Sequence, residues 1–184
     1  TLSSYKIRKG IRKGKKFRQG IEGEKEVGQQ LEQLRETGAK VFHDIQGPNF
    51  NVDHVVIHPS GIYVIETKTL SKREREDQHL FYDGKVIRLD DKPLPRDPLE
   101  QVEANLRWLG GQLKSSTGKE FHMKSIVLFP GWFIEHSIAP WHSDIWVLSP
   151  NALPKILNKE PQDRLPPEDL NLASYHLERM IRAR

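Results

Sequence analysis

The chain has 184 residues, which is long enough for one compact domain with a sizeable core. It contains no cysteine, so neither a disulfide framework nor a thiolate metal site is available. The 29 Lys and Arg residues only mildly exceed the 25 Asp and Glu residues, and no uninterrupted apolar run approaches the ~18 residues of a membrane-spanning helix.

We therefore expect a cytoplasmic protein with three parts. These are a basic tail over residues 1–19, a central domain over residues 20–150, and a helical C-terminal extension over residues 151–184 packed on the same domain. Because the sequence begins with Thr1 rather than Met, it could be a fragment that has lost an upstream segment or a membrane anchor. The residues do not indicate an oligomeric state.

The tail has basic residues throughout and no acidic residue. Its basic side chains are Lys6, Arg8, Lys9, Arg12, Lys13, Lys15, Lys16 and Arg18. Gly10 and Gly14 weaken any helix there. The tail could follow nucleic-acid phosphates or the anionic face of a membrane, and a solvated linker is an equally weighted alternative.

An amphipathic helix is predicted from about residue 22 to residue 37, ending near Gly38. Its buried stripe consists of Val27, Leu31 and Leu34. Glu24 lies three residues before Val27, on the same stripe, so we expect an inward carboxylate that can supply a metal or water ligand. The alternative is that Glu24, like Glu22, is simply favourable at the positive end of a helix.

After an outer strand over residues 41–45, the segment 51–68 predicts a β-hairpin. Two β-branched runs flank Pro59-Ser60-Gly61, and if Pro59 and Ser60 form the loop, His58 pairs with Gly61. The same register places Asp53 directly opposite Glu66, and cross-strand partners share a face. Two carboxylates at such a short separation repel each other unless a positive charge lies between them.

Lys68 follows Glu66 by two residues, so strand alternation returns it to the same face. The hairpin is apolar on both faces, which is typical of buried central strands, and buried carboxylates need a partner or a metal. A surface face with a Glu-Lys salt bridge is the simpler alternative. We favour a divalent-metal site beside an ammonium group.

The polar segment 71–77 predicts a solvated loop, although Lys72, Arg73 and Arg75 could hold a phosphate backbone. Asp83-Gly84 predicts a tight hairpin between residues 80–82 and 86–87. A helix should begin near Pro98, with a core stripe and with Gln101 and Asn105 on the flank of that stripe, where they are more typical of exposed polar residues. The stripe is Val102, Leu106, Leu109 and Leu113.

Residues 125–129 and 145–148 are expected to form buried strands, and residues 151–157 and 170–182 to form helices. The order of these elements predicts an α/β fold with a mixed central β-sheet flanked by helices on both faces. His122, His136 and His142 lack metal-ligand spacing, and the four Trp residues are more typical of core or interface positions than of base stacking.

Asp53 followed by Glu66-Thr67-Lys68 resembles the PD-(D/E)XK nuclease motif, with Val52 where the superfamily name has proline. The surrounding sequence is similar to one branch, the nuclease-related domain (NERD) family, over about residues 20–130. The similar blocks, in order, are Gly20–Glu24 with Val27 and Leu31, Val52–Val56, Gly61–Lys68, and Asp97–Val102 with Asn105.

The resemblance implies a restriction-endonuclease-like core and phosphodiester hydrolysis with Mg²⁺ or Mn²⁺. It implies that Asp53, Glu66 and the Thr67 carbonyl hold the cation, and that Lys68 orients the attacking water. By the same resemblance Glu24 would support a second ion or a metal-bound water, and Gln101 would position substrate or a metal ligand. We expect DNA as the substrate, with RNA as an alternative.

Two other interpretations belong to different functional classes. The first is a nuclease-like fold without catalysis that binds nucleic acid or assembles with other proteins, although Asp53, Glu66 and Lys68 are all present. The second is a domain anchored to a membrane surface through the basic tail. Because the sequence has no base-reading motif, we expect no strong sequence specificity.

Overall fold

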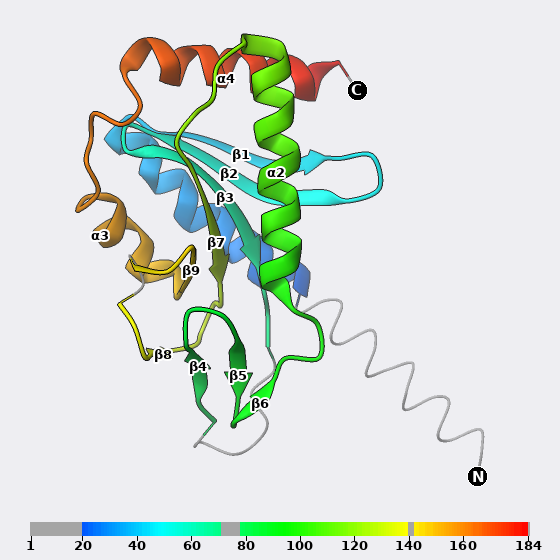
Figure 1. Ribbon diagram of the computed structural model, residues 1–184, viewed down its shortest axis with the longest axis vertical. Coiled ribbons are helices and arrows are strands. Elements are labelled where there is room, and N and C mark those ends of the chain that lie inside the picture. Colours follow the sequence, from blue (N-terminus) through cyan, green and yellow to red (C-terminus); the bar gives the residue numbers. More distant parts are fainter. Residues whose placement is uncertain (1–19, 71–77, 140–141, 184) are drawn as a thin grey trace.

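Residues 20–70, 78–139 and 142–183 are described by the computed structural model, an α/β fold with helices on both faces of a central sheet (Figure 1). The central sheet has five strands in the order β1-β2-β3-β7-β9. They are β1 (Lys40–Gln46), β2 (Asn51–His58), β3 (Gly61–Thr67), β7 (Met123–Leu128) and β9 (Ile145–Leu148). The first three pair antiparallel and the last three parallel, so the predicted mixed sheet is confirmed.

A second sheet lies beyond the carboxyl ends of β3 and β7, and the sequence did not predict it (Figure 1). Its order is β6-β5-β4-β8. The strands are β4 (Leu80–Tyr82), β5 (Ile87–Leu89), β6 (Lys92–Pro93) and β8 (Ile134–His136). The hairpin expected at Asp83-Gly84 forms, but Tyr82 pairs with Ile87, so residues 83–86 form a wider loop than predicted.

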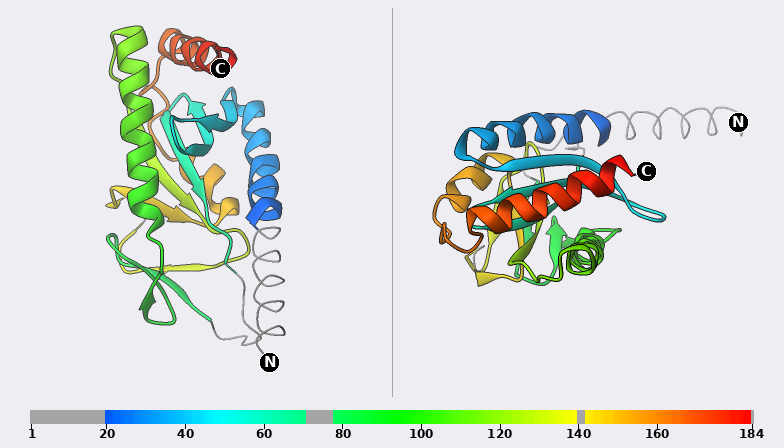
Figure 2. Two further views of the ribbon diagram at one scale, coloured as in Figure 1. Left: turned by 90° about the vertical axis from the view of Figure 1, so that its right-hand side faces the viewer. Right: turned by 90° about the horizontal axis from the view of Figure 1, so that it is seen from above.

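Helices cover both faces of the central sheet (Figure 2). On one face lie the N-terminal helix, residues 20–32, and α3 (Leu153–Leu157), which follows the 3-10 helix η3 (Pro150–Ala152). On the other face lie α2 (Pro98–Thr117) and α4 (Pro167–Arg182). The N-terminal helix continues as a 3-10 helix, η1 (Gln33–Thr37), and ends at Gly38 with φ 87°, a conformation that glycine adopts readily.

The β2-β3 hairpin has the register expected from its Pro59-Ser60 turn. Pairing runs from His58 opposite Gly61 to His54 opposite Ile65. Alternate residues face the two helical layers, since Val55 and Val64 pack in the cluster with α2 and α4. Val56, on the opposite face, packs with the N-terminal helix. Burial on both faces fixes this register, because a slip of one residue would exchange the two sets of side chains.

Local sequence explains why α2 begins at the end of the loop that follows β6. The Asp97 carboxylate accepts a hydrogen bond from the Leu99 N–H at 2.9 Å, and Pro98 occupies the first helical position. Val102, Leu109 and Leu113 then bury one stripe against the sheet. The first turn of α2 is thereby held next to the carboxyl end of β3.

Candidate active site

The residues expected to form the site lie where β3 ends. Thr67 is the last residue of β3 and pairs with Leu128 of β7. The Lys68 N–H continues this pairing by donating to the Leu128 carbonyl at 2.8 Å. The carboxyl end of β3, the end of β7 and the first turn of α2 therefore meet at one edge of the central sheet (Figure 1).

Asp53 lies on β2, one residue before His54, where the regular pairing of the hairpin ends. Its Oδ2 accepts a hydrogen bond from the Thr67 backbone N–H at 2.8 Å. The side chain of Asp53 thus contacts the end of β3 directly, next to Glu66. Burial raises the pKa of Asp53, and so does the charge of Asp44, while the Thr67 hydrogen bond and Lys68 oppose the shift.

Glu66, Lys68 and Gln101 form a chain of polar contacts. The Lys68 ammonium donates to Glu66 Oε1 at 2.9 Å and to Gln101 Oε1 at 3.2 Å. Only 2 % of the Glu66 surface is exposed, whereas Lys68 is partly exposed and Gln101 is exposed on the first turn of α2. One oxygen of a buried carboxylate is therefore paired, and the ammonium that pairs with it can reach solvent.

The second oxygen, Glu66 Oε2, is buried without a hydrogen-bond partner. Burial and the charges of Asp53 and Glu24 together raise the pKa of Glu66 to about 7, although Lys68 acts to lower it. Burial also raises the pKa of Glu24 to about 7, together with the charges of Asp53 and Asp44. These carboxylates are close enough to repel one another, and Lys68 offsets their charge only in part.

This environment fits a divalent cation with a preference for oxygen ligands. An unpartnered buried carboxylate oxygen beside a second carboxylate is the donor set that Mg²⁺ and Mn²⁺ prefer. Within the described ranges, no group of three or more His, Cys, Asp or Glu side chains is arranged to hold a metal ion. The ligands of a cation here would be Asp53, Glu66 and a backbone oxygen such as that of Thr67, with water completing the coordination shell.

Not every residue expected from the sequence can be placed. Lys13, Lys15, Lys16 and Arg18 of the tail and Lys72, Arg73 and Arg75 of the loop lie outside the described residues. Glu24 is placed near the carboxylates, although it is half-buried rather than part of the fully buried stripe. The structure therefore brings together Glu24, Asp53, Glu66, Lys68 and Gln101.

Asn105 departs from its expected position on α2. Its side chain is 3 % exposed, and its Nδ2 is buried without a partner, so it is not an exposed polar residue. Leu106, expected in the core stripe, is only partly buried, because the helix is rotated toward the Asn105 side. The spacing of apolar residues could not separate these two neighbouring faces, which lie about 100° apart.

Two further features near the site were missed from the sequence. The first is Asp44, an exposed residue of β1 whose charge acts on both Glu24 and Asp53. The second is a pair of histidines: His43 Nδ1 lies 2.8 Å from His54 Nδ1, and His43 Nε2 lies 2.8 Å from Glu32 Oε1. Burial lowers the pKa of His54 to about 4, so its ring is neutral near pH 7.

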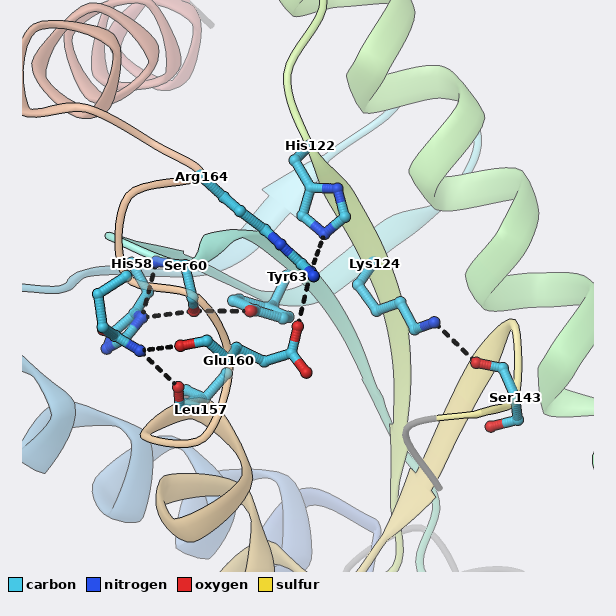
Figure 3. A network of polar contacts seen from close by, with 10 residues as sticks. His58, Ser60, Tyr63, His122, Lys124, Ser143, Leu157, Glu160 and Arg164 are labelled. Carbon is cyan, nitrogen blue, oxygen red and sulfur yellow. Dashed lines mark hydrogen bonds and ion pairs between the residues drawn. The ribbon is translucent and has the colours of Figure 1, made fainter. Parts of the chain in front are cut away.

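The opposite end of the hairpin carries a separate polar network (Figure 3). Ser60 Oγ lies 2.7 Å from His58 Nδ1 and 2.7 Å from Tyr63 Oη, and all three side chains are buried. Nearby, Arg164 donates to His122 Nε2 at 3.0 Å and to Glu160 at 2.7 Å. Arg164 thus joins the C-terminal segment to His122, and the Leu165 N–H donates to the Pro59 carbonyl of the turn at 2.9 Å, at the end of the strands remote from Thr67.

A pH titration of stability should reveal the raised pKa of Glu66. The pKa of Glu66 is raised from 4.5 to about 7 in the folded protein, so the folded state keeps a proton that the unfolded state releases within this range. The free energy of unfolding of the metal-free protein should then decrease as pH rises through this range. Glu66→Gln cannot lose that proton and still offers Lys68 an acceptor oxygen. At pH values above this pKa of about 7, we expect the free energy of unfolding of the variant to exceed that of the parent by about 2–3 kcal/mol.

Urea denaturation in the presence of EDTA, at about pH 4.5 and about pH 8, measures this difference. The variant and the parent should nearly converge at the lower pH, where Glu66 is protonated in the folded state and about half protonated in the unfolded state. Glu135→Gln, at an exposed position of β8, is the matched control and should follow the parent at both values. Equal stability of parent and Glu66→Gln at the higher pH would exclude an uncompensated carboxylate at Glu66.

Comparison with known protein families identifies the class of protein to which the site belongs. The family described as nuclease-related domain, NERD, matches residues 19–130. Comparisons with curated proteins and with solved structures found no match. The matched range contains the N-terminal helix, the β2-β3 hairpin and all of α2, so it includes every placed residue of the site. The chain belongs to the nuclease-related domain (NERD) family, with a fold compatible with the restriction-endonuclease-like core.

Proposed function

We propose that this protein is a metal-dependent nuclease that hydrolyses phosphodiester bonds of DNA without strong sequence specificity. The observation that carries the proposal is the convergence of Asp53, Glu66 and Lys68 at the end of β3. An oxygen of Glu66 is buried there without a partner. Membership of the nuclease-related family supports the same reaction class.

Phosphodiester hydrolysis needs positive charge, because negative oxygens shield the phosphorus from a nucleophile. When bound, Mg²⁺ or Mn²⁺ supplies that charge. Asp53, Glu66 and the Thr67 carbonyl would hold it, and the Asp53 side chain is already oriented by the Thr67 N–H. Glu24 would hold water or a further cation at the margin of the site.

Lys68 has the position expected of a group that acts on the attacking water. Its ammonium is held between Glu66 and Gln101, and it remains partly exposed toward an approaching substrate. It would orient a water molecule and stabilise negative charge as that charge develops on the phosphate oxygens. Gln101 orients the ammonium through its Oε1, and its amide group remains able to donate to substrate.

One assay tests the proposal directly. The protein is incubated with linear and circular DNA, each single- and double-stranded, in EDTA, Mg²⁺ or Mn²⁺. We expect cleavage only with a cation and loss of cleavage in Asp53→Asn. Binding of DNA without cleavage under every condition would instead support a non-catalytic binding module.

The basic tail should contribute affinity rather than chemistry. Each phosphate contact releases counterions, so removing residues 1–19 is expected to weaken DNA binding and to reduce its dependence on salt, by about one unit of slope per lost contact. Fluorescence anisotropy with labelled DNA over a series of salt concentrations measures both quantities. An unchanged slope would show that the tail does not touch phosphates.

The same truncation tests the membrane interpretation. No helix in the described ranges is long and apolar enough to cross a membrane. The basic tail could contact an anionic membrane surface. Binding of the full chain to phosphatidylserine vesicles, lost on removal of residues 1–19, would support a membrane anchor. Loss of DNA binding alone would favour the nucleic-acid role.

A further inference from the structure

An exposed aromatic residue lies at the tip of the β1-β2 hairpin. The hairpin projects beyond the sheet beside α2, and residues 47–50 form its loop (Figure 1, Figure 2). Phe50 is 37 % exposed, and its ring meets the partly buried Trp108 of α2 edge to face, with ring centroids 5.2 Å apart and an interplanar angle of 88°. Trp108 therefore holds Phe50 next to α2, while part of Phe50 remains open to solvent.

Gly47 allows the Phe50 ring to fold back over the loop. A Cβ atom at Gly47 would lie 2.4 Å from Cζ and Cε2 of Phe50 and 2.7 Å from Cε1, closer than such atoms approach in proteins. The Gly47 N–H also donates to the Phe50 carbonyl at 2.8 Å, which closes the loop. Because Gly47 does not adopt a left-handed φ, its missing side chain makes room for the ring rather than for the backbone. Gly47 and Trp108 together fix the position of Phe50.

The two aromatic residues belong to the two elements that build the candidate active site. Phe50 precedes Asp53 of β2 by three residues, about 10 Å of extended chain. Trp108 follows Gln101 by two turns of α2, again about 10 Å, on nearly the same side of the helix. Since Gln101 contacts Lys68 at 3.2 Å, the aromatic pair and the site lie on the same side of the central sheet.

The chemistry of the loop favours a nucleobase over a charged partner. No residue in the range 45–52 is ionisable. Three exposed residues in or beside the loop carry amides, namely Gln46, Asn49 and Asn51, and an amide both donates and accepts hydrogen bonds. A nucleobase presents an uncharged aromatic face that can stack on Phe50, and it has donors and acceptors at its edge.

We propose that Phe50, supported by Trp108, stacks on an unpaired base of the DNA strand that enters the active site. This proposal rests on the function proposed above and names its substrate class. The substrate is DNA that is single-stranded, or opened, about three nucleotides from the bond that is cut, because stacked nucleotides are about 3.4 Å apart. Bases within a duplex already stack on one another, so they offer Phe50 no open face. Stacking accepts every base, which agrees with cleavage without strong sequence specificity.

DNA binding in EDTA tests the stacking without requiring cleavage. Two labelled oligonucleotides have the same number of phosphates: a thymidine oligomer and the same chain with every base removed. Fluorescence anisotropy should show that the parent binds the thymidine oligomer about 10- to 100-fold more tightly. Phe50→Leu keeps an apolar contact with Trp108 but has no aromatic face, so it should lose this preference.

Three further variants separate stacking from a structural role. Phe50→Tyr retains an aromatic face and should keep the preference for the thymidine oligomer. Gly47→Ala displaces the Phe50 ring without removing it, and should bind as Phe50→Leu does. Tyr175→Ala is the matched control, because Tyr175 is also an exposed aromatic residue in an edge-to-face pair, with His176 of α4. It should bind as the parent does. All four variants should keep the parental salt dependence, since no phosphate contact changes.

The outcomes separate stacking from the nuclease function. If the parent cleaves DNA with Mg²⁺ or Mn²⁺ but Phe50→Leu keeps the preference for the thymidine oligomer, the stacking site is wrong and the nuclease function stands. If the preference depends on Phe50 but the parent cuts no DNA, the stacking site stands and the nuclease function fails.

Two other results overturn the stacking site. A parental dimer in analytical ultracentrifugation that Phe50→Leu converts to a monomer would assign Phe50 to a contact between two copies of the chain. If the parent binds the two oligonucleotides equally, no base stacks on Phe50. If such a parent also cuts no DNA, both proposals fail.

Discussion

Replacing Lys68 with alanine is expected to lower the rate of DNA cleavage by about 100- to 10,000-fold while leaving DNA affinity nearly unchanged. The ammonium is fixed by Glu66 at 2.9 Å and Gln101 at 3.2 Å, a position suited to a water molecule and a developing negative charge. An interaction made mainly in the transition state affects kcat more than binding. Single-turnover cleavage and anisotropy with the same labelled DNA measure the two quantities.

Two variants make this result interpretable. Lys68→Arg keeps the positive charge and should retain Glu66 pairing, yet the guanidinium geometry differs, so only partial activity is expected. Lys92→Ala removes a lysine from an exposed position of β6 and should cleave as the parent does. Parental cleavage rates in Lys68→Ala would mean that any nuclease activity arises elsewhere, and the binding-module interpretation would replace the present one.

Mg²⁺ or Mn²⁺ is expected to stabilise the folded protein, and Asp53→Asn should abolish that effect. At a cation concentration about 100 times the dissociation constant, mass action on the folded state raises the melting temperature by about 5–10 °C for a domain of this size. The gain should be large because the cation also relieves repulsion among Asp53, Glu66 and Glu24. Differential scanning fluorimetry in EDTA, Mg²⁺ and Mn²⁺ measures the shift.

Asp53→Asn is a conservative change, because the asparagine oxygen can still accept the Thr67 N–H. Its melting temperature in EDTA should equal or exceed that of the parent, since it removes a charge next to a buried carboxylate. Asp91→Asn, at an exposed position between β5 and β6, is the matched control and should retain the full stabilisation by both ions. If millimolar concentrations of neither ion change the melting temperature of the parent, a functional metal site at Asp53 and Glu66 is excluded.

These two results share one physical basis. The site gathers carboxylates whose pKa values are raised, and Lys68 neutralises only part of their charge. Such a cluster lowers the stability of the metal-free protein. Residues with a purely structural role would not be expected to gather in an arrangement that lowers stability. The same arrangement gives a cation its binding free energy. Stability without metal and affinity for metal should therefore change in opposite directions across the variants.

Several features could be predicted from the sequence because neighbouring residues determine them. The Pro59-Ser60 turn sets the register of the β2-β3 hairpin, and the observed pairs from His58–Gly61 to His54–Ile65 follow it. Strand alternation brings Glu66 and Lys68 to one face, where the structure joins them at 2.9 Å. Asp97 and Pro98 likewise place the start of α2.

Other features depended on packing between elements that are distant in the sequence. The sequence predicted Asp44 only as part of an outer strand, whereas the pairing of β1 with β2 brings its charge near Asp53. Asn105 was expected to be exposed, but the rotation of α2 against the sheet buries it. Likewise β8 joins β4 in a second sheet that no local pattern indicates. Turn chemistry and residue periodicity act over a few residues and so determine hairpins and helix ends, whereas strand partners and helix rotation follow from how the whole core is filled.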